Sequence, residues 1–222
     1  MTLSMIPSTV SADPTSRRVD PVPGEASVPI RVAIALFPDA EELDWAGPWE
    51  VFGYWASRWP DEVQVFTIAE TLDPIRCARG LRVLPDRSWS TSPVIDVLVY
   101  PGGRGTRGQI RADSVKERLL GLREGGALLA SVCTGALVFA GAGLLDGLAA
   151  TTHWQALNDL RRLGTEIEVC AHKRFVDAGN VVTTAGVTAG IDVALYLVAR
   201  LHSVGRAQSI RRALQYDPEP PV

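Results

Sequence analysis

Apolar runs that alternate with helix-forming segments predict an α/β fold, a single-domain three-layer α/β/α sandwich around a mostly parallel sheet. Short runs of aliphatic and β-branched residues have the form of strands buried on both faces, and segments of helical length separate most of them. One such run, 127–132, stops at a cysteine where a helical pattern starts at once. The 222 residues, 46% of them apolar, suffice for one domain with a sizeable core.

Each expected element has its own signal. Compact apolar runs bounded by glycine, proline or polar residues indicate strands at 30–37, 63–69, 75–78, 81–84, 94–100, 127–132, 166–171, 174–177 and 181–184. Apolar residues at helical spacing, or small residues after the cysteine, indicate helices at 45–59, 112–124, 134–142, 154–163, 187–202 and 204–216. The strands 75–78 and 81–84 flank Arg79-Gly80, which predicts a short hairpin.

Composition divides the chain into three segments. Residues 1–28 combine prolines with serine and threonine and have almost no hydrophobic periodicity, so we expect a flexible N-terminal extension. A misplaced start, with Met5 as an internal start, is the alternative. Residues 29–217 are expected to form the α/β domain, and residues 218–222 (PEPPV) a proline-rich tail.

Charge, cysteine content and hydropathy exclude several classes of protein. The net charge is −3 and the basic residues are scattered, so nothing indicates a nucleic-acid partner. Cys77, Cys133 and Cys170 form no CxxC pair and no even framework, which is typical of a reducing compartment. The longest apolar stretch is interrupted by Asp146, and the N-terminus lacks the pattern of a signal peptide. We therefore expect a cytoplasmic protein with no membrane partner and no metal site.

Cys133 is the residue most indicative of function. We expect it on a strand-to-helix elbow at the carboxyl edge of the sheet, where open α/β sheets bind their ligands. Thr134 and Gly135 allow the sharp turn. The N-terminus of the following helix is expected to favour the thiolate and to lower the pKa of the thiol. The alternative is a buried cysteine that only fills space in the core.

Asp44 follows the first strand and is predicted to lie near that thiol. A carboxylate beside a thiol can transfer protons during catalysis. The alternative is that Asp44 only caps the helix 45–59 through its side chain. Both roles can hold together.

Further candidates lie after other strands or helices. Gly102 and Gly103 follow the strand 94–100, and their backbone N–H groups, with the N–H and hydroxyl of Thr134, are candidates for stabilising charge and ordering water. The alternative for the glycines is an ordinary strand-exit turn. Trp45, His153 and Trp154 are candidates for lining a substrate pocket. For His153 a purely structural role is an equal alternative, and for the tryptophans the alternative is core or dimer packing.

With these residues placed, the chain resembles the ThiJ/PfpI group of the class I glutamine amidotransferase-like fold, a flavodoxin-like architecture. The matching stretches are Leu43-Asp44 with Gly47-Pro48, Pro101-Gly102-Gly103, residues 131–135 (SVCTG), 151–154 (TTHW) and 185–192 (AGVTAGID). The resemblance spans roughly 30–217, and the elbow and the AGVTAGID stretch are its specific parts.

Within this group, the Cys-Thr-Gly-Ala elbow, the Leu-Asp pair and the ending at 216–221 (YDPEPP) most resemble the isonitrile hydratase branch. The resemblance implies hydration of an isonitrile to an N-substituted formamide without a metal or organic cofactor, in a homodimer that takes a small-molecule substrate. It implies a thioimidate on Cys133, with Asp44 as general acid and base and Thr134 assisting.

Departures from the wider group narrow the activity. Protease-like members place histidine directly after the nucleophile, where this chain has Thr134, so a peptidase is not expected. Deglycase-like members carry glutamate where this chain has Asp44. A glyoxalase or deglycase acting at the same cysteine remains the alternative enzyme. A non-enzymatic cysteine sensor, related to the sensing domain of AraC-type regulators, is the second alternative, although no recognition helix follows the domain in this sequence.

Overall fold

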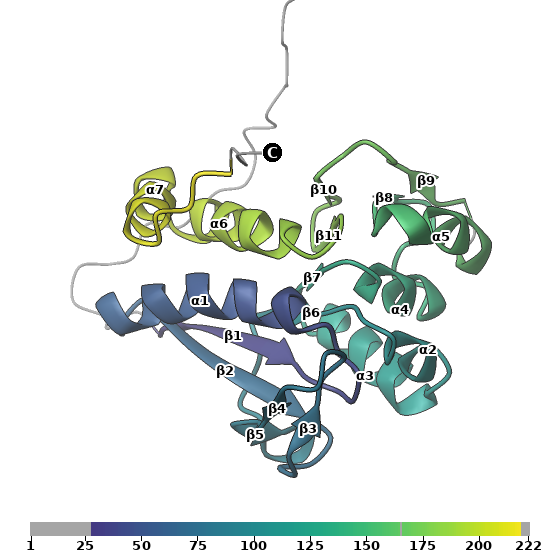
Figure 1. Ribbon diagram of the computed structural model, residues 1–222, viewed down its shortest axis with the longest axis horizontal. Coiled ribbons are helices and arrows are strands. Elements are labelled where there is room, and N and C mark those ends of the chain that lie inside the picture. The colour runs from purple at the N-terminus through teal and green to yellow at the C-terminus, as the bar shows by residue number, and fades with distance from the viewer. Residues whose placement is uncertain (1–27, 165, 219–222) are drawn as a thin grey trace, which may run out of the picture.

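A computed structural model describes residues 28–164 and 166–218 (Figure 1). The expected extension 1–28 lies outside the described residues except for Val28, and so does the expected tail except for Pro218. No helix in the described ranges has the length and apolar character needed to cross a membrane.

Seven strands form the central sheet in the order β10-β11-β7-β6-β1-β2-β5. Neighbouring strands run parallel except β10 and β11, which are antiparallel. The strands are β1 (Ile30–Ala35), β2 (Val63–Ala69), β5 (Arg87–Ser88), β6 (Val97–Tyr100), β7 (Leu128–Ser131), β10 (Phe175–Asp177) and β11 (Val181–Thr184). The predicted mostly parallel sheet is confirmed.

Two small sheets lie beside the central one. The predicted hairpin is confirmed as the antiparallel pair β3 (Ile75–Arg76) and β4 (Arg82–Val83). The second pair, β8 (Ala149–Ala150) and β9 (Glu168–Val169), is parallel.

Helices cover both faces of the central sheet. They are α1 (Glu42–Arg58), α2 (Thr106–Gln109), α3 (Asp113–Glu124), α4 (Gly135–Gly141), α5 (Leu157–Leu163), α6 (Ala189–Leu201) and α7 (Val204–Ala213). The β1-α1-β2 and β6-α3-β7 crossovers run in opposite directions along the sheet. Because such crossovers are right-handed, α1 and α3 lie on opposite faces. Helices α6 and α7 pack on α1, and α4 packs on α3, which completes the predicted three layers (Figure 1).

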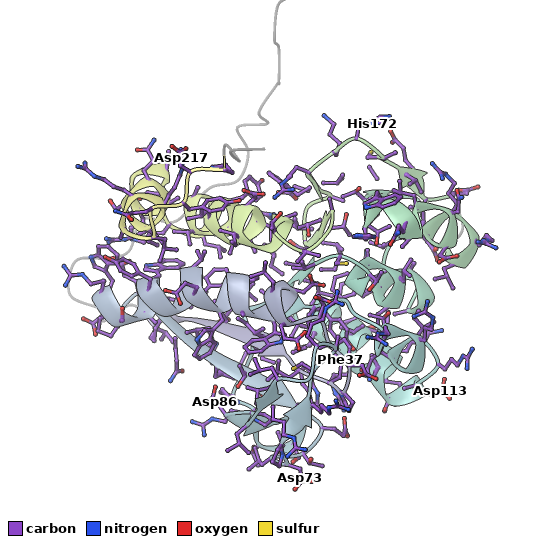
Figure 2. All side chains as sticks on the ribbon, in the orientation of Figure 1. Phe37, Asp73, Asp86, Asp113, His172 and Asp217 are labelled. Atoms are coloured by element: carbon purple, nitrogen blue, oxygen red, sulfur yellow. The ribbon has the colours of Figure 1, made fainter. Side chains whose placement is uncertain are left out.

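The core follows from this burial on both faces. In β1 the run from Val32 to Ala35 is almost fully buried, and apolar residues occupy every position because helices cover both sides of the strand. Figure 2 shows Phe37, just after β1, within the molecule, whereas polar side chains lie at the periphery, among them Asp73, Asp113, His172 and Asp217.

Some elements were not expected from the sequence. The short elements α2, β5 and β8 have two to four residues, too few to show a period. The expected helix 154–163 is divided, because a 3₁₀ turn at Trp154–Ala156 precedes α5.

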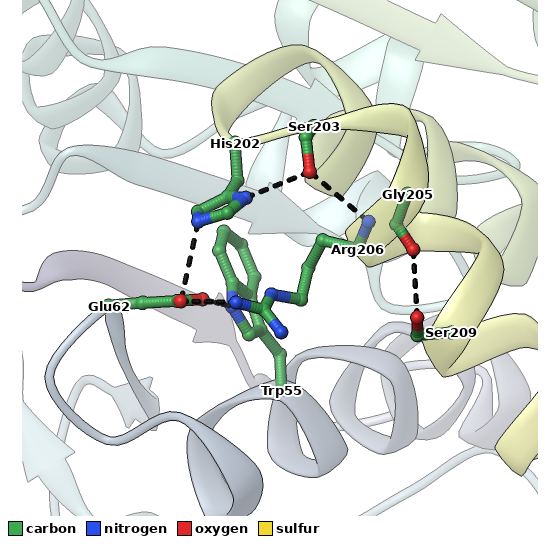
Figure 3. Close-up of polar contacts among 7 residues, drawn as sticks. All are labelled: Trp55, Glu62, His202, Ser203, Gly205, Arg206 and Ser209. Carbon is green, nitrogen blue, oxygen red and sulfur yellow. Dashed lines mark hydrogen bonds and ion pairs between the residues drawn. The ribbon is translucent and has the colours of Figure 1, made fainter.

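A polar cluster ties the end of α1 and the start of β2 to the two C-terminal helices (Figure 3). The indole N–H of Trp55 donates to Oε2 of Glu62 over 2.6 Å, and Arg206 forms an ion pair with Oε1 of the same carboxylate. Nε2 of His202 lies 3.3 Å from Oε1. Ser203 caps α7 by accepting the backbone N–H of Arg206. Glu62 therefore joins segments that are far apart in the sequence.

Glu62→Gln keeps an acceptor for Trp55 but removes the charge that faces Arg206. We expect the free energy of unfolding to fall by about 1–2 kcal/mol, because a half-buried guanidinium then loses its carboxylate. Urea denaturation at pH 7 measures the change. Glu50→Gln, at an exposed position of α1, is the matched control and should stay within about 0.5 kcal/mol. Equal losses in the two variants would contradict the role given to Glu62.

Candidate active site

The predicted elbow is present at Cys133, two residues after the end of β7. Its φ of +56° is left-handed, a conformation that a non-glycine residue adopts at a cost and that is typical of functional sites. The elbow is held by the N–H of Cys133, which donates to Ala185 O over 3.0 Å, and by Thr152 Oγ1, which donates to Cys133 O over 2.7 Å. Position 135, at the start of α4, has room only for glycine, because a Cβ there would lie 2.4 Å from Tyr100 O.

Asp44 lies in the first turn of α1, with its side chain directed across the fold. Glu41 is the N-cap residue, and Asp44 is fully buried. Its Oδ2 accepts the backbone N–H of Gly102 over 2.8 Å, and its carboxyl group acts on the Cys133 thiol electrostatically. The alternative that Asp44 only caps its own helix is therefore wrong. Its Oδ1 is buried and has no hydrogen-bond partner of its own in residues 28–164 and 166–218.

The turn after β6 positions these groups. The N–H of Gly103 donates to Thr134 Oγ1 over 2.9 Å, and that hydroxyl donates to Gly103 O over 3.3 Å. A Cβ on Gly102 would lie 2.6 Å from Thr134 N and 2.8 Å from Asp44 Oδ2, so this close approach needs glycine. The expectation that both glycine N–H groups and the Thr134 hydroxyl face a ligand is corrected: in the structure they bond to one another and to Asp44.

Two backbone donors act on the sulfur, and one of them, Thr134, was among the predicted ones. The N–H groups of Thr134 and Val187 lower the pKa of the Cys133 thiol and so favour its ionised form. Val187 has a φ of +41°, an uncommon conformation for a β-branched residue. Sequence reasoning missed Val187: the stretch 185–192 is distinctive, but nothing in it indicates which N–H turns toward the cysteine.

Burial dominates the electrostatics of this pair. Burial raises the pKa of Asp44 to about 7, against the opposing effect of the Gly102 N–H. Burial and the negative charge of Asp44 also raise the pKa of Cys133, and the two backbone N–H groups do not offset this. The expected acidic thiol is therefore wrong for the resting protein. Near neutral pH the two groups share one proton, and they titrate as a coupled pair.

The three aromatic candidates fall in different places. Trp45 is buried and its indole interacts with the Cys77 thiol, so it packs in the core, and it is not among the residues that line the pocket next to Thr134. The ring of His153 lies against Gly186, where a Cβ would be 2.4 Å from Cδ2. Trp154 is 71% exposed, and its ring centre lies 5.7 Å from that of His153.

A pocket of about 440 Å³ adjoins the site and shares Gly103, Thr134 and His153 with it. Its other walls come from α2 and the residue after it, from α4, and from α5 with the 3₁₀ turn before it, and they comprise Thr106, Arg107, Ile110, Leu137, Gln155, Ala156, Asp159, Arg162 and Leu163. A larger cavity of about 710 Å³ lies between the ends of β1 and β2 and helix α3, and none of the predicted site residues lines it. In the described part of the chain, no three His, Cys, Asp or Glu side chains are grouped to hold a metal ion.

Comparison with known proteins defines the class. Residues 30–200 match the model of the DJ-1/PfpI family, and the chain belongs to this family. It is 36% identical to the isonitrile hydratase of Pseudomonas putida over 192 aligned residues. The alignment covers 86% of this chain and 81% of that protein. A ThiJ/PfpI family structure from Pseudomonas syringae superimposes with a TM-score of 0.77 at 31% identity, covering 87% of this chain and 78% of the other.

A third relative is a regulator. The chain is 40% identical to the HTH-type transcriptional regulator CdhR of Pseudomonas aeruginosa over 129 aligned residues. The alignment covers 58% of this chain and 38% of the regulator. The family therefore places similar domains in an enzyme and in a transcriptional regulator.

Asp44→Asn removes the charge that raises the pKa of Cys133 while nearly keeping the size of the side chain. We expect the pKa of the thiol to fall, so that iodoacetamide alkylates Cys133 faster in the variant than in the wild type near pH 7. Mass spectrometry gives the rate at each cysteine, with the partly exposed Cys170 as internal reference. Unchanged or slower alkylation of Cys133 would show that Asp44 does not hold the thiol in its protonated form.

Proposed function

We propose that the protein is a cysteine-dependent isonitrile hydratase, which adds water to an isonitrile and releases an N-substituted formamide. One observation carries the proposal: the buried carboxyl group of Asp44 acts on the Cys133 thiol, and its Oδ1 has no hydrogen-bond partner in the described residues. The similarity to the P. putida isonitrile hydratase over most of both chains supports it.

In the first half of the reaction, the sulfur of Cys133 bonds to the terminal carbon of the isonitrile. The thiol proton passes to Asp44, which delivers it to the same carbon. The product is a thioimidate, R–N=CH–S–Cys133, in which the atoms of the thiol have added to the isonitrile carbon. The N–H groups of Thr134 and Val187 stabilise the negative charge on sulfur while the proton is on Asp44.

In the second half, the Asp44 carboxylate takes one proton from water as the water oxygen bonds to the thioimidate carbon, and passes this proton to nitrogen, which gives R–NH–CH(OH)–S–Cys133. The hydroxyl proton then passes to Asp44 and from there to sulfur as the C=O bond forms and the C–S bond breaks, and the formamide R–NH–CHO leaves. The hydration is not a redox reaction, so one shared proton and one water complete the cycle.

Two other functions use the same cysteine. A glyoxalase or deglycase would attack an aldehyde carbon with the Cys133 sulfur. A ligand or redox sensor needs no turnover, and the similarity to CdhR over 129 residues favours it as the second candidate.

The deciding assay incubates the purified protein with p-tolyl isonitrile and follows formamide formation, with methylglyoxal in parallel. We expect hydration by the wild type, none by Cys133→Ala, and a rate lower by about 10²-fold in Asp44→Asn, because Asn cannot carry the proton. For the wild type, kcat/KM should rise with pH through about 7, since below this value Asp44 is protonated and the pair holds one proton too many. Turnover of methylglyoxal alone would contradict the proposal.

We also propose a homodimer, as the family resemblance implies. Trp45, Phe52 and Trp55 of α1 are buried within the protomer, so these side chains are not available to an interface. Trp154 remains as a large exposed aromatic. Multi-angle light scattering should report twice the chain mass of 23.9 kDa at micromolar concentration. A particle of single-chain mass at that concentration would refute the dimer.

A further inference from the structure

We propose that the substrate's substituent ends in an anionic group such as a carboxylate, and that Arg107 binds this group in the pocket beside Cys133. The inference rests on the proposed function for the identity of the reacting end. It concerns the opposite end of the molecule, which the reaction leaves unchanged.

The pocket has room for such a substituent. Its volume of about 440 Å³ lies within the usual range for small-molecule sites, roughly 300–1,000 Å³. One part of the wall is apolar, formed by Ile110, Leu137, Ala156 and Leu163. An aliphatic or aromatic body fits against these side chains. The pocket therefore admits more than the isonitrile group itself.

The charged groups in the wall do not balance. Arg162 is paired with Asp159 over 2.9 Å, whereas Arg107 forms no ion pair with an acidic side chain in the described part of the chain. The wall thus carries two guanidinium groups and one carboxylate, an excess of one positive charge. In a concave site such an excess attracts an anionic ligand and rejects a cationic one.

Arg107 is held at a fixed place relative to the nucleophile. It lies in α2, whose first residue, Thr106, donates through Oγ1 to Gly103 O over 2.8 Å. The same Gly103 holds the hydroxyl of Thr134, the neighbour of Cys133. Nδ1 of His153 accepts the N–H of Gln155 over 3.3 Å, which fixes the orientation of this ring of the pocket wall.

The test compares 4-isocyanobenzoate with its methyl ester as substrates of the whole protein. We expect kcat/KM to be higher for the carboxylate by about five- to tenfold, the value of one charge-assisted contact at an exposed site. Arg107→Gln should reduce this preference to about twofold or less. Arg111→Gln removes a nearby exposed arginine that does not line the pocket, and should leave the preference unchanged. Equal use of both substrates, or a preference that survives in Arg107→Gln, would overturn the inference.

A second measurement separates this inference from the proposed function. Calorimetry with 4-formamidobenzoate and its methyl ester on Cys133→Ala measures binding without turnover. If 4-formamidobenzoate binds more tightly than its methyl ester, and Arg107→Gln abolishes the difference, the anion site is supported. Should neither isonitrile be hydrated in that case, only the proposed reaction fails. Hydration of both isonitriles together with equal binding of both formamides would overturn the anion site alone.

Discussion

The burial of an ionisable carboxyl group beside a thiol is the constraint on which the rest of the site depends. Asp44 is fully buried, so its charged form needs a donor from the protein, and the N–H of Gly102 supplies it over 2.8 Å. That contact brings the turn after β6 so close that no side chain fits at Gly102, and the same turn fixes Thr134 through Gly103. The parallel sheet makes this possible, because the carboxyl ends of β1, β6 and β7 meet at one edge.

This constraint also explains why the elbow does not give an acidic thiol. The N–H groups of Thr134 and Val187 lower the pKa of the Cys133 thiol. Burial and the negative charge of Asp44 raise this pKa by more, so the thiol stays protonated. The folded protein keeps a proton on Asp44 up to about pH 7, whereas an unfolded chain loses it near the ordinary value. Folding stability therefore falls as pH rises between these two values, since the folded state binds the extra proton. Burying the Asp44 carboxyl group therefore costs stability above the ordinary pKa of an aspartate.

The sequence predicts the elements that have a local pattern, but it does not predict the hydrogen bonds between residues far apart in the chain. Buried strands, the hairpin and the elbow have their own patterns, and they are found where those patterns lie. The role of Asp44 was ambiguous because α1 begins at Glu42, one turn earlier than the apolar spacing indicates, which moves Asp44 from the cap into the helix. The partners of the Gly102 and Gly103 N–H groups are 58 and 31 residues away, and no local pattern specifies them. Trp45 was misplaced because spacing does not tell whether an aromatic side chain faces the core or a pocket.

The proton count of the site suits addition better than hydrolysis. Hydrolysis of an amide or peptide needs an acid that protonates a leaving nitrogen, commonly a histidine beside the nucleophile. Here the next residue is Thr134, whose hydroxyl both accepts from and donates to Gly103, so it has no proton to spare. The coupled pair of Cys133 and Asp44 handles one proton at a time. Adding S–H to an isonitrile carbon uses that one proton, and returning the thiol to its resting state restores it.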